Sequence, residues 1–88
     1  MTTDNYFENI SLEEFYKLVS DNVIRLRKEK KISQLKLANE IGHGNATFLG
    51  KAELLAEGKH FNLEHVFKIS QALNVDINEF FKPIDEVK

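Results

Sequence analysis

Three histidines are the side chains best suited to metal binding or acid–base chemistry in this 88-residue sequence. His43, His60 and His65 are separated by 17 and 5 residues, whereas two histidine ligands on one helix face are separated by four. The chain has no cysteine, which excludes disulfides and thiolate zinc sites. Serine and aspartate are present, but no motif brings them together with a histidine. The sequence therefore predicts no metal, no cofactor and no enzymatic activity.

Positive charge is concentrated in one segment of a mildly acidic chain. The formal net charge is −2, yet residues 25–36 (RLRKEKKISQLK) hold six Lys or Arg and one Glu, a local net charge of +5. The rest of the chain then carries −7. Such asymmetry can give one face of the molecule a positive potential. The alternative is a solvated helix end, where lysines favour the negative end of the helix dipole.

Nothing in the sequence indicates insertion into a membrane. No apolar run approaches the ~18 residues that a spanning helix needs. The first ten residues, MTTDNYFENI, lack the basic region and apolar stretch of a signal peptide. We therefore expect a cytoplasmic protein without membrane contact.

A long amphipathic helix is predicted near the N-terminus. Ser11 and Glu14 have the spacing of a capping box, in which a serine and a glutamate three residues on bond each other's backbone amides. Apolar residues then recur at steps of three and four, which predicts a helix over about residues 12–30. They are Leu12, Phe15, Tyr16, Val19, Val23 and Leu26.

Four shorter helices are predicted after it, giving an all-α, single-domain chain over residues 11–83. Residues 1–10 and 84–88 are expected to be flexible. Ser33 can cap the second helix and Gly42 can end it, and a third runs from about Ala46 to Glu57. Asn62 can cap the fourth, with apolar positions Leu63, Val66, Phe67, Ile69 and Leu73, and Asp76 can cap a short fifth helix, INEFF, before Pro83.

The order of these segments resembles the Cro/cI-type (XRE) helix-turn-helix family. The resemblance rests on VIRLRKEKKISQLKLANEIG, then KAE, then FNLEHVFKISQALNVDINEFF, and it covers roughly residues 19–81. The last segment is most similar to restriction–modification controller proteins. The resemblance implies a five-helix, lambda-repressor-like bundle whose first helix is extended at its N-terminus. It also implies that helices two and three form the motif and that helix three enters the DNA major groove.

The turn of the motif departs from the family pattern by one residue. Ten residues, 43–52, separate Gly42 from Glu53, where the family usually has nine. An ungapped alignment would bury Lys51, which is unfavourable. Placing the extra residue within HGN directs Leu49 and Ala52 inward. The connection from Glu53 to Leu63 is also about two residues longer than usual, through either a longer helix three or a larger loop.

With this register, the resemblance places the base-reading positions at Asn45, Ala46, Thr47 and Lys51. A lysine can donate to guanine O6 and N7, and threonine can bond a base or touch a thymine methyl. Asn45 is either an adenine reader or the cap of helix three. Phe48 beside them is either a core residue or a contact to a thymine methyl.

The resemblance also implies contacts to phosphate and one structural ion pair. Gln34 occupies the family's phosphate-binding position, and Glu53 is expected to pair with Arg27 on the first helix. Helix caps and solvated lysines are the alternative roles for the phosphate-binding candidates. These candidates are Ser33, Gln34, Lys36, His43, Lys59, His60 and Asn62.

Together these features predict a DNA-binding transcriptional regulator, a repressor or autoregulator, that binds operator DNA as a homodimer. The dimer surface is open between the start of the first helix and the residues Phe80, Phe81 and Ile84, and the alternative for the start of the first helix is that its apolar stripe covers the edge of the bundle. The alternative is a protein-interaction module of the same fold, antitoxin-like, with weak or no sequence-specific DNA binding. The acidic balance and the small residues before helix three motivate that alternative.

Overall fold

A computed structural model describes residues 6–84, and all regular structure within this range is helical. The prediction of an all-α protein is confirmed. The described part contains four α-helices, and the segment predicted as a fifth is a 3-10 helix. The elements are η1 (Tyr6–Asn9), α1 (Leu12–Glu29), α2 (Gln34–Glu40), α3 (Thr47–Leu54), η2 (Ala56–Gly58), α4 (Leu63–Leu73) and η3 (Ile77–Phe81).

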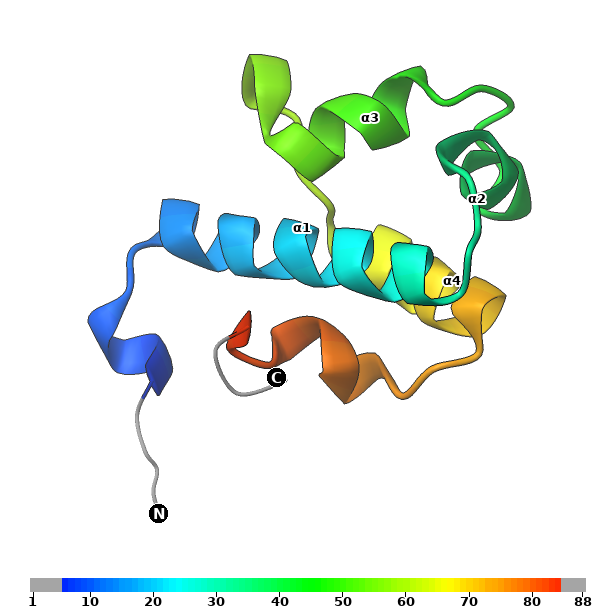
Figure 1. The fold of residues 1–88 in the computed structure, drawn as a ribbon. Helices are drawn as coiled ribbons and strands as arrows, with labels where there is room; N and C mark the ends of the chain where they lie inside the picture. The colour runs from blue at the N-terminus through cyan, green and yellow to red at the C-terminus, as the bar shows by residue number, and fades with distance from the viewer. Residues whose placement is uncertain (1–5, 85–88) are drawn as a thin grey trace.

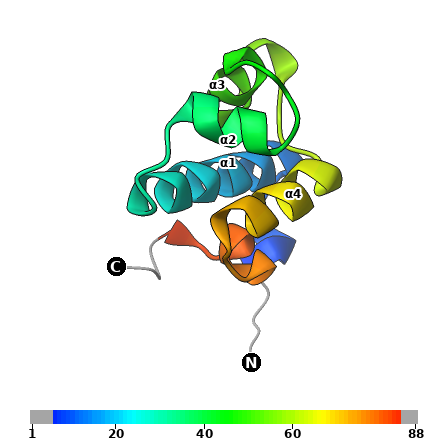
Figure 2. The ribbon, with the colours of Figure 1, turned by 90° about the vertical axis from the view of Figure 1, so that its right-hand side faces the viewer.

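Helix α1 runs through the middle of the molecule (Figure 1). Helices α2 and α3 lie on one side of it, whereas α4 and η3 lie on the other, and the turned view shows the same arrangement (Figure 2). Because α1 contacts α3, α4 and η3, it is the element around which the others pack.

The hydrophobic core lies between α1 and these two groups of helices. Val66, Ile69 and Leu73 of α4 are buried, but Leu63 and Phe67 from the same predicted apolar set are 81% and 54% exposed. Fewer apolar residues of α4 are therefore buried than its sequence pattern predicted. The core comprises Val19, Val23, Leu26, Leu37, Ala38, Ile41, Leu49, Ala52, Phe61, Val66, Ile69, Leu73 and Phe80.

Four of the five predicted helix starts have the caps expected from the sequence, and the exception is the start of α3 at Ala46. Ser11 Oγ accepts from the Glu14 amide at 3.1 Å, and Glu14 Oε1 accepts from the Ser11 amide at 2.8 Å, as in a capping box. The Ser33 hydroxyl accepts from the amide of Lys36 at 3.0 Å. Asn62 and Asp76 cap α4 and η3 in the same way. These short-range bonds satisfy amides that the helices themselves leave without partners.

Three of the helices end in a Schellman motif, in which a left-handed residue turns the chain and the next amide bonds back to the helix. Lys31, Gly42 and Asn74 are the left-handed residues, with φ of 58°, 90° and 56°. After α1, the amides of Lys31 and Ile32 donate to the carbonyls of Lys28 and Arg27. Gly42 ends α2 as predicted.

Helix α3 is shorter than predicted, because it ends at Leu54 instead of Glu57. Leu55 adopts a left-handed conformation with φ of 56°, and its amide bonds the Ala52 carbonyl at 3.2 Å. Glu57 and Gly58 are also left-handed. This irregular segment turns the chain back so that Phe61 reaches the core, where it is 5% exposed. The extra residues before Leu63 therefore enlarge the loop and do not lengthen α3.

The C-terminal segment is held against α1 by a buried asparagine. Asn22 is completely buried, and its Nδ2 donates to the carbonyls of Phe80 and Lys82 at 2.9 and 2.8 Å. Its Oδ1 accepts from Arg25. Because all its polar atoms have partners, Asn22 fixes η3 without leaving an unsatisfied group in the core.

The structure describes only part of the two terminal segments that were expected to be flexible. Residues 1–5 and 85–88 lie outside the described residues, so most of the expectation for 1–10 and 84–88 concerns segments that are not described. Within the described part, Tyr6–Asn9 form η1, and the Phe7 ring meets Phe15 edge-on at 5.9 Å. No helix between residues 6 and 84 is long and apolar enough to cross a membrane.

The left-handed lysine after α1 gives a test of this description. We expect Lys31→Gly to raise the free energy of unfolding by about 1 kcal/mol, because glycine adopts positive φ without the clash of a Cβ. The matched control is the neighbouring Lys30, whose φ is −85°, where glycine should lower it by about 0.5–1 kcal/mol. Urea unfolding of both variants measures the two changes, and equal signs would contradict the backbone assignment.

Candidate functional site

A buried ion pair fixes α3 on α1. Arg27 Nε and Nη2 donate to the two carboxylate oxygens of Glu53 at 2.7 and 3.0 Å, and their side chains are 11% and 3% exposed. Arg27 Nη1 also donates to the Ile32 carbonyl at 3.0 Å, and Gln34 Nε2 donates to Glu53 Oε1 at 2.9 Å. The pair expected from the family resemblance is therefore present, and Gln34 extends it to α2.

Two further contacts pack α3 against α1 and α2. Ser20 on α1 donates its hydroxyl hydrogen to the Ala52 carbonyl at 2.8 Å, and Ala52 is fully buried. On the α2 side, Gly50 faces the Gln34 amide, which a Cβ at Gly50 would approach to 3.6 Å. The small side chain of Ala52 lets α3 lie close to α1, whereas a Cβ at Gly50 would be in ordinary van der Waals contact with Gln34.

The opposite face of α3 points away from α1. Figure 1 shows α3 along the upper edge of the molecule, with α1 beneath it. Leu49, Ala52 and Glu53 are buried against the bundle. At 100° per residue, Thr47, Lys51 and Leu54 then form the outward stripe, and Leu54 is 78% exposed. Leu54 was not predicted as a contact residue, because the adjacent Leu54 and Leu55 give no sign in the sequence of which one faces solvent.

Lys51 is the cation on this outward stripe, and it is already paired. Its Nζ lies 2.8 Å from Glu57 Oε1 in the loop after α3. The hydrogen bond and the charge of Lys51 lower the pKa of Glu57 below its ordinary value. Glu57 was missed in the sequence because the predicted longer helix would have directed it elsewhere.

The predicted base-reading residues separate into two groups. Thr47 and Lys51 lie on the outward stripe. Asn45 Oδ1 instead accepts from the Thr47 amide at 2.9 Å, so that the Asn45 side chain supports the first turn of α3. Ala46 directly precedes α3 and is half-buried.

The predicted phosphate-binding residues are also divided. Gln34 is committed to Glu53, Ser33 and Asn62 cap their helices, and Lys36 pairs with Glu40 at 3.2 Å. Lys59 is exposed in the loop after η2. His60 is not on an open surface, because its half-buried ring stacks on Tyr16 at 3.9 Å, and His43 stacks on Phe48.

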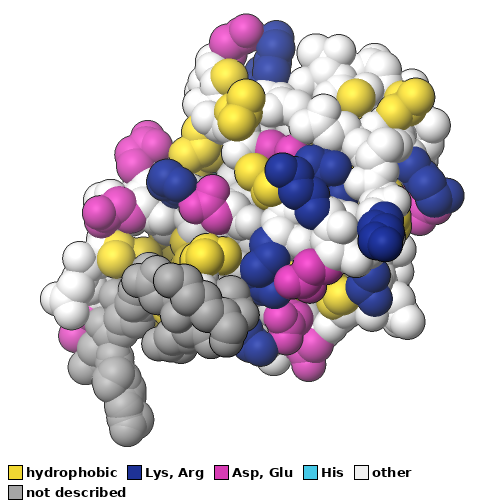
Figure 3. Space-filling model, in the orientation of Figure 1, with side chains coloured by type: hydrophobic (Ala, Val, Ile, Leu, Met, Phe, Trp, Pro, Cys, Tyr) yellow, Lys and Arg dark blue, Asp and Glu magenta, His cyan; other side chains and the backbone are white. Residues whose placement is uncertain are grey.

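Lys and Arg side chains cover one region of the surface. Figure 3 shows them over the C-terminal half of α1 and the start of α2, interleaved with Asp and Glu. Lys28, Lys30 and Lys31 are exposed there. This placement agrees with the basic segment at residues 25–36, although neighbouring carboxylates reduce its net charge.

Histidines distant in sequence meet beside the turn before α3. The ring centroids of His43 and His65 lie 5.4 Å apart, and Phe48 packs against both. His65 Nδ1 accepts from the Asn62 amide at 3.0 Å. Burial and the nearby His43 lower the pKa of His65. Across residues 6–84, no three His, Cys, Asp or Glu side chains form a group that could hold a metal ion.

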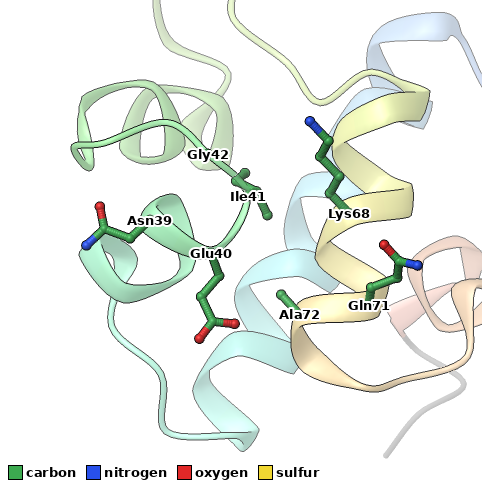
Figure 4. A pocket seen from close by; sticks show the side chains of 7 residues that line it. All are labelled: Asn39, Glu40, Ile41, Gly42, Lys68, Gln71 and Ala72. Carbon is green, nitrogen blue, oxygen red and sulfur yellow. The ribbon is translucent and has the colours of Figure 1, made fainter.

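A shallow cleft of about 510 Å³ lies between the end of α2 and α4 (Figure 4). Its charged side chains, Glu40 and Lys68, extend in different directions in this view. Each is paired within its own helix, with Lys36 and Glu64. The cleft thus offers no converging set of free polar groups for a ligand.

Comparison with known proteins gives no relative: no family model, no curated protein and no solved structure matches this chain.

The buried pair predicts a large loss of stability from a single change. We expect Glu53→Ala to lower the free energy of unfolding by about 3 kcal/mol, because it leaves the Arg27 charge buried without its partner. Glu40→Ala, which removes an exposed partner of Lys36, should lower it by at most about 0.5 kcal/mol. Urea unfolding measures both values, and similar small losses would show that Arg27 finds other partners.

The histidine cluster predicts a dependence of stability on pH. Because the pKa of His65 in the folded protein lies below its ordinary value of 6.5, the unfolded chain binds more protons between these two values. The free energy of unfolding should therefore be highest above pH 6.5 and fall as the pH drops below it. The charged or titratable groups acting on His65 are His43, Glu64, Lys68 and His60.

His65→Gln tests this, since glutamine also completes a capping box but does not titrate. Its free energy of unfolding should change less between pH 7.5 and 5.5 than that of the wild type. An unchanged slope in His65→Gln would assign the effect to another group.

Proposed function

We propose that this protein is a sequence-specific DNA-binding transcriptional regulator, a repressor or autoregulator, with a Cro/cI-type, lambda-repressor-like helix-turn-helix. The observation that carries the proposal is the exposed stripe of α3, which the buried Arg27–Glu53 pair holds facing away from the bundle. A helix presented in this way can enter the major groove, whose width accommodates one α-helix.

The chemistry of the stripe suits base edges. Lys51 can donate to guanine O6 and N7, and the methyl groups of Thr47 and Leu54 can contact thymine methyls. Lys28, Lys30 and Lys31 are cations that can lie near phosphates and contribute affinity without sequence preference. Gln34 has one amide hydrogen beyond the one given to Glu53, which leaves it a donor for phosphate.

A homodimer on a two-fold-symmetric operator is part of the proposal, because a single short helix reads only a few base pairs. Two surfaces are candidates for the dimer contact. In the C-terminal one, Phe80 is fully buried within its own chain and cannot contribute. Leu12 at the start of α1 is 63% exposed and Phe7 is 50% exposed. These residues favour the N-terminal end of α1. We expect the protein to act in the cytoplasm without a cofactor or catalysis.

The second candidate is a protein-interaction module that uses the same surface. It is favoured by two observations: Lys51 is neutralised by Glu57, and apolar side chains at Leu35 and Leu54 are 52% and 78% exposed. An apolar surface with few free charges is typical of protein contacts.

Titration onto DNA at several salt concentrations separates the two candidates. A DNA-binding regulator should prefer DNA from its own upstream region to random DNA, and its affinity should fall steeply with salt as counterions are released. Equal affinity for all sequences would favour the interaction module.

Substitutions on α3 and α2 should then differ in effect. We expect Lys51→Ala to reduce the preference for operator over random DNA about tenfold, the effect of losing one base contact. Gln34→Ala should weaken binding to both DNAs by similar factors. Gel-shift titrations measure these ratios, with circular dichroism as the check of folding. If Lys51→Ala leaves the preference unchanged, Lys51 does not face the bases.

A further inference from the structure

Glu57 and Lys51 form an acid–base pair on the surface proposed to meet DNA. Their charged atoms lie 2.8 Å apart, and the side chains are 64% and 35% exposed. Lys51 belongs to the outward stripe of α3, whereas Glu57 reaches it from the loop six residues later.

The backbone brings Glu57 to this place at a conformational cost. Leu55 and Glu57 both have φ near +55°, which is unfavourable for residues with a Cβ. In a helix continuing through residue 57, Glu57 would lie about 120° around the axis from Lys51 and more than one turn further along it. The left-handed turns instead return its carboxylate to Lys51.

A carboxylate at a DNA-binding surface needs a specific partner. Beside phosphates it is repelled, but in the major groove it can accept a hydrogen bond from the cytosine N4 amino group. Guanine O6 and cytosine N4 are neighbours within a base pair, joined by a hydrogen bond of about 2.9 Å. The Lys51–Glu57 spacing matches that distance, with the donor and acceptor roles reversed.

We propose that Lys51 and Glu57 together read one G·C base pair in a fixed orientation, an inference that rests on the proposed function. Lys51 donates to guanine O6 and N7, and Glu57 accepts from cytosine N4. Across the major groove, C·G and A·T present the neighbouring acceptor and donor in the opposite order. T·A keeps the order but has a methyl group in place of N7, so Lys51 loses one acceptor there. Glu57 is thus a residue that determines specificity.

Selection of binding sites from a duplex library with a randomised 20-bp core tests this proposal without a known operator. The wild type should select a motif with G·C at one position in each half-site. Glu57→Gln can both donate and accept, so its selected motif should lose orientation at that position only. Its preference for G·C over C·G should fall about tenfold. Its affinity for random DNA should rise several-fold, since a negative charge is removed.

Glu64→Gln is the matched control. Glu64 is also exposed, at 67%, and pairs with Lys68 at 2.7 Å, but it lies on α4. This variant makes the same change of charge and should select the wild-type motif. Lys51→Met is a second test, because it should lose the guanine preference at the same position as Glu57→Gln.

The outcomes distinguish the two proposals. If the wild type selects a motif and Glu57→Gln selects the same motif with the same preferences, the Lys51–Glu57 reading is wrong while the proposed function stands. If Lys51→Met and Glu57→Gln alter different positions, the reading is also wrong. If the wild type selects no motif, the proposed function fails, and the reading of a base pair fails with it.

Discussion

The arrangement of the three N-terminal α-helices depends on one buried ion pair. Arg27 and Glu53 are both almost removed from water, so each charge requires the other, and both require hydrogen bonds of good geometry. These are supplied by the bidentate contact, the Ile32 carbonyl and the Gln34 amide. Apolar packing tolerates sliding and rotation more readily than a paired charge does. The pair therefore selects one placement of α3 among those that the core alone would permit.

The dependence is strong because α3 is short. Eight residues make about two turns, which are not stable as an isolated helix in water. Its first turn relies on the Asn45 side chain, and its last residue is followed directly by the left-handed Leu55. Contacts with α1 and α2 thus supply both the stability and the orientation of α3. The contacts with α1 and α2 therefore also determine the direction in which the outward side chains of α3 point.

Local features were predictable from the sequence, whereas contacts between distant segments were predictable only in part. Ser11, Ser33, Asn62 and Asp76 act through amides two or three residues away, so their spacing identified the helix starts. The Arg27–Glu53 pair was expected from the family resemblance and not from any local pattern.

The remaining differences arise from tertiary structure. The end of α3 could not be predicted, because Leu55 has a side chain common in helices and adopts positive φ only as the chain turns toward Phe61. The Lys51–Glu57 contact and the approach of His43 to His65 follow from that turn and from the packing of α4.

Because Glu53 pairs with Arg27, the orientation of α3 does not depend on the lengths of the connections before and after it. Compared with the helix-turn-helix pattern that the sequence resembles, the connection before α3 has one residue more and the connection after it about two more. Because α3 is fixed through its own middle, by the Ala52 carbonyl and the Glu53 carboxylate, such additions need not rotate it. The two connections are therefore the parts of this molecule whose lengths can change without altering the orientation of α3.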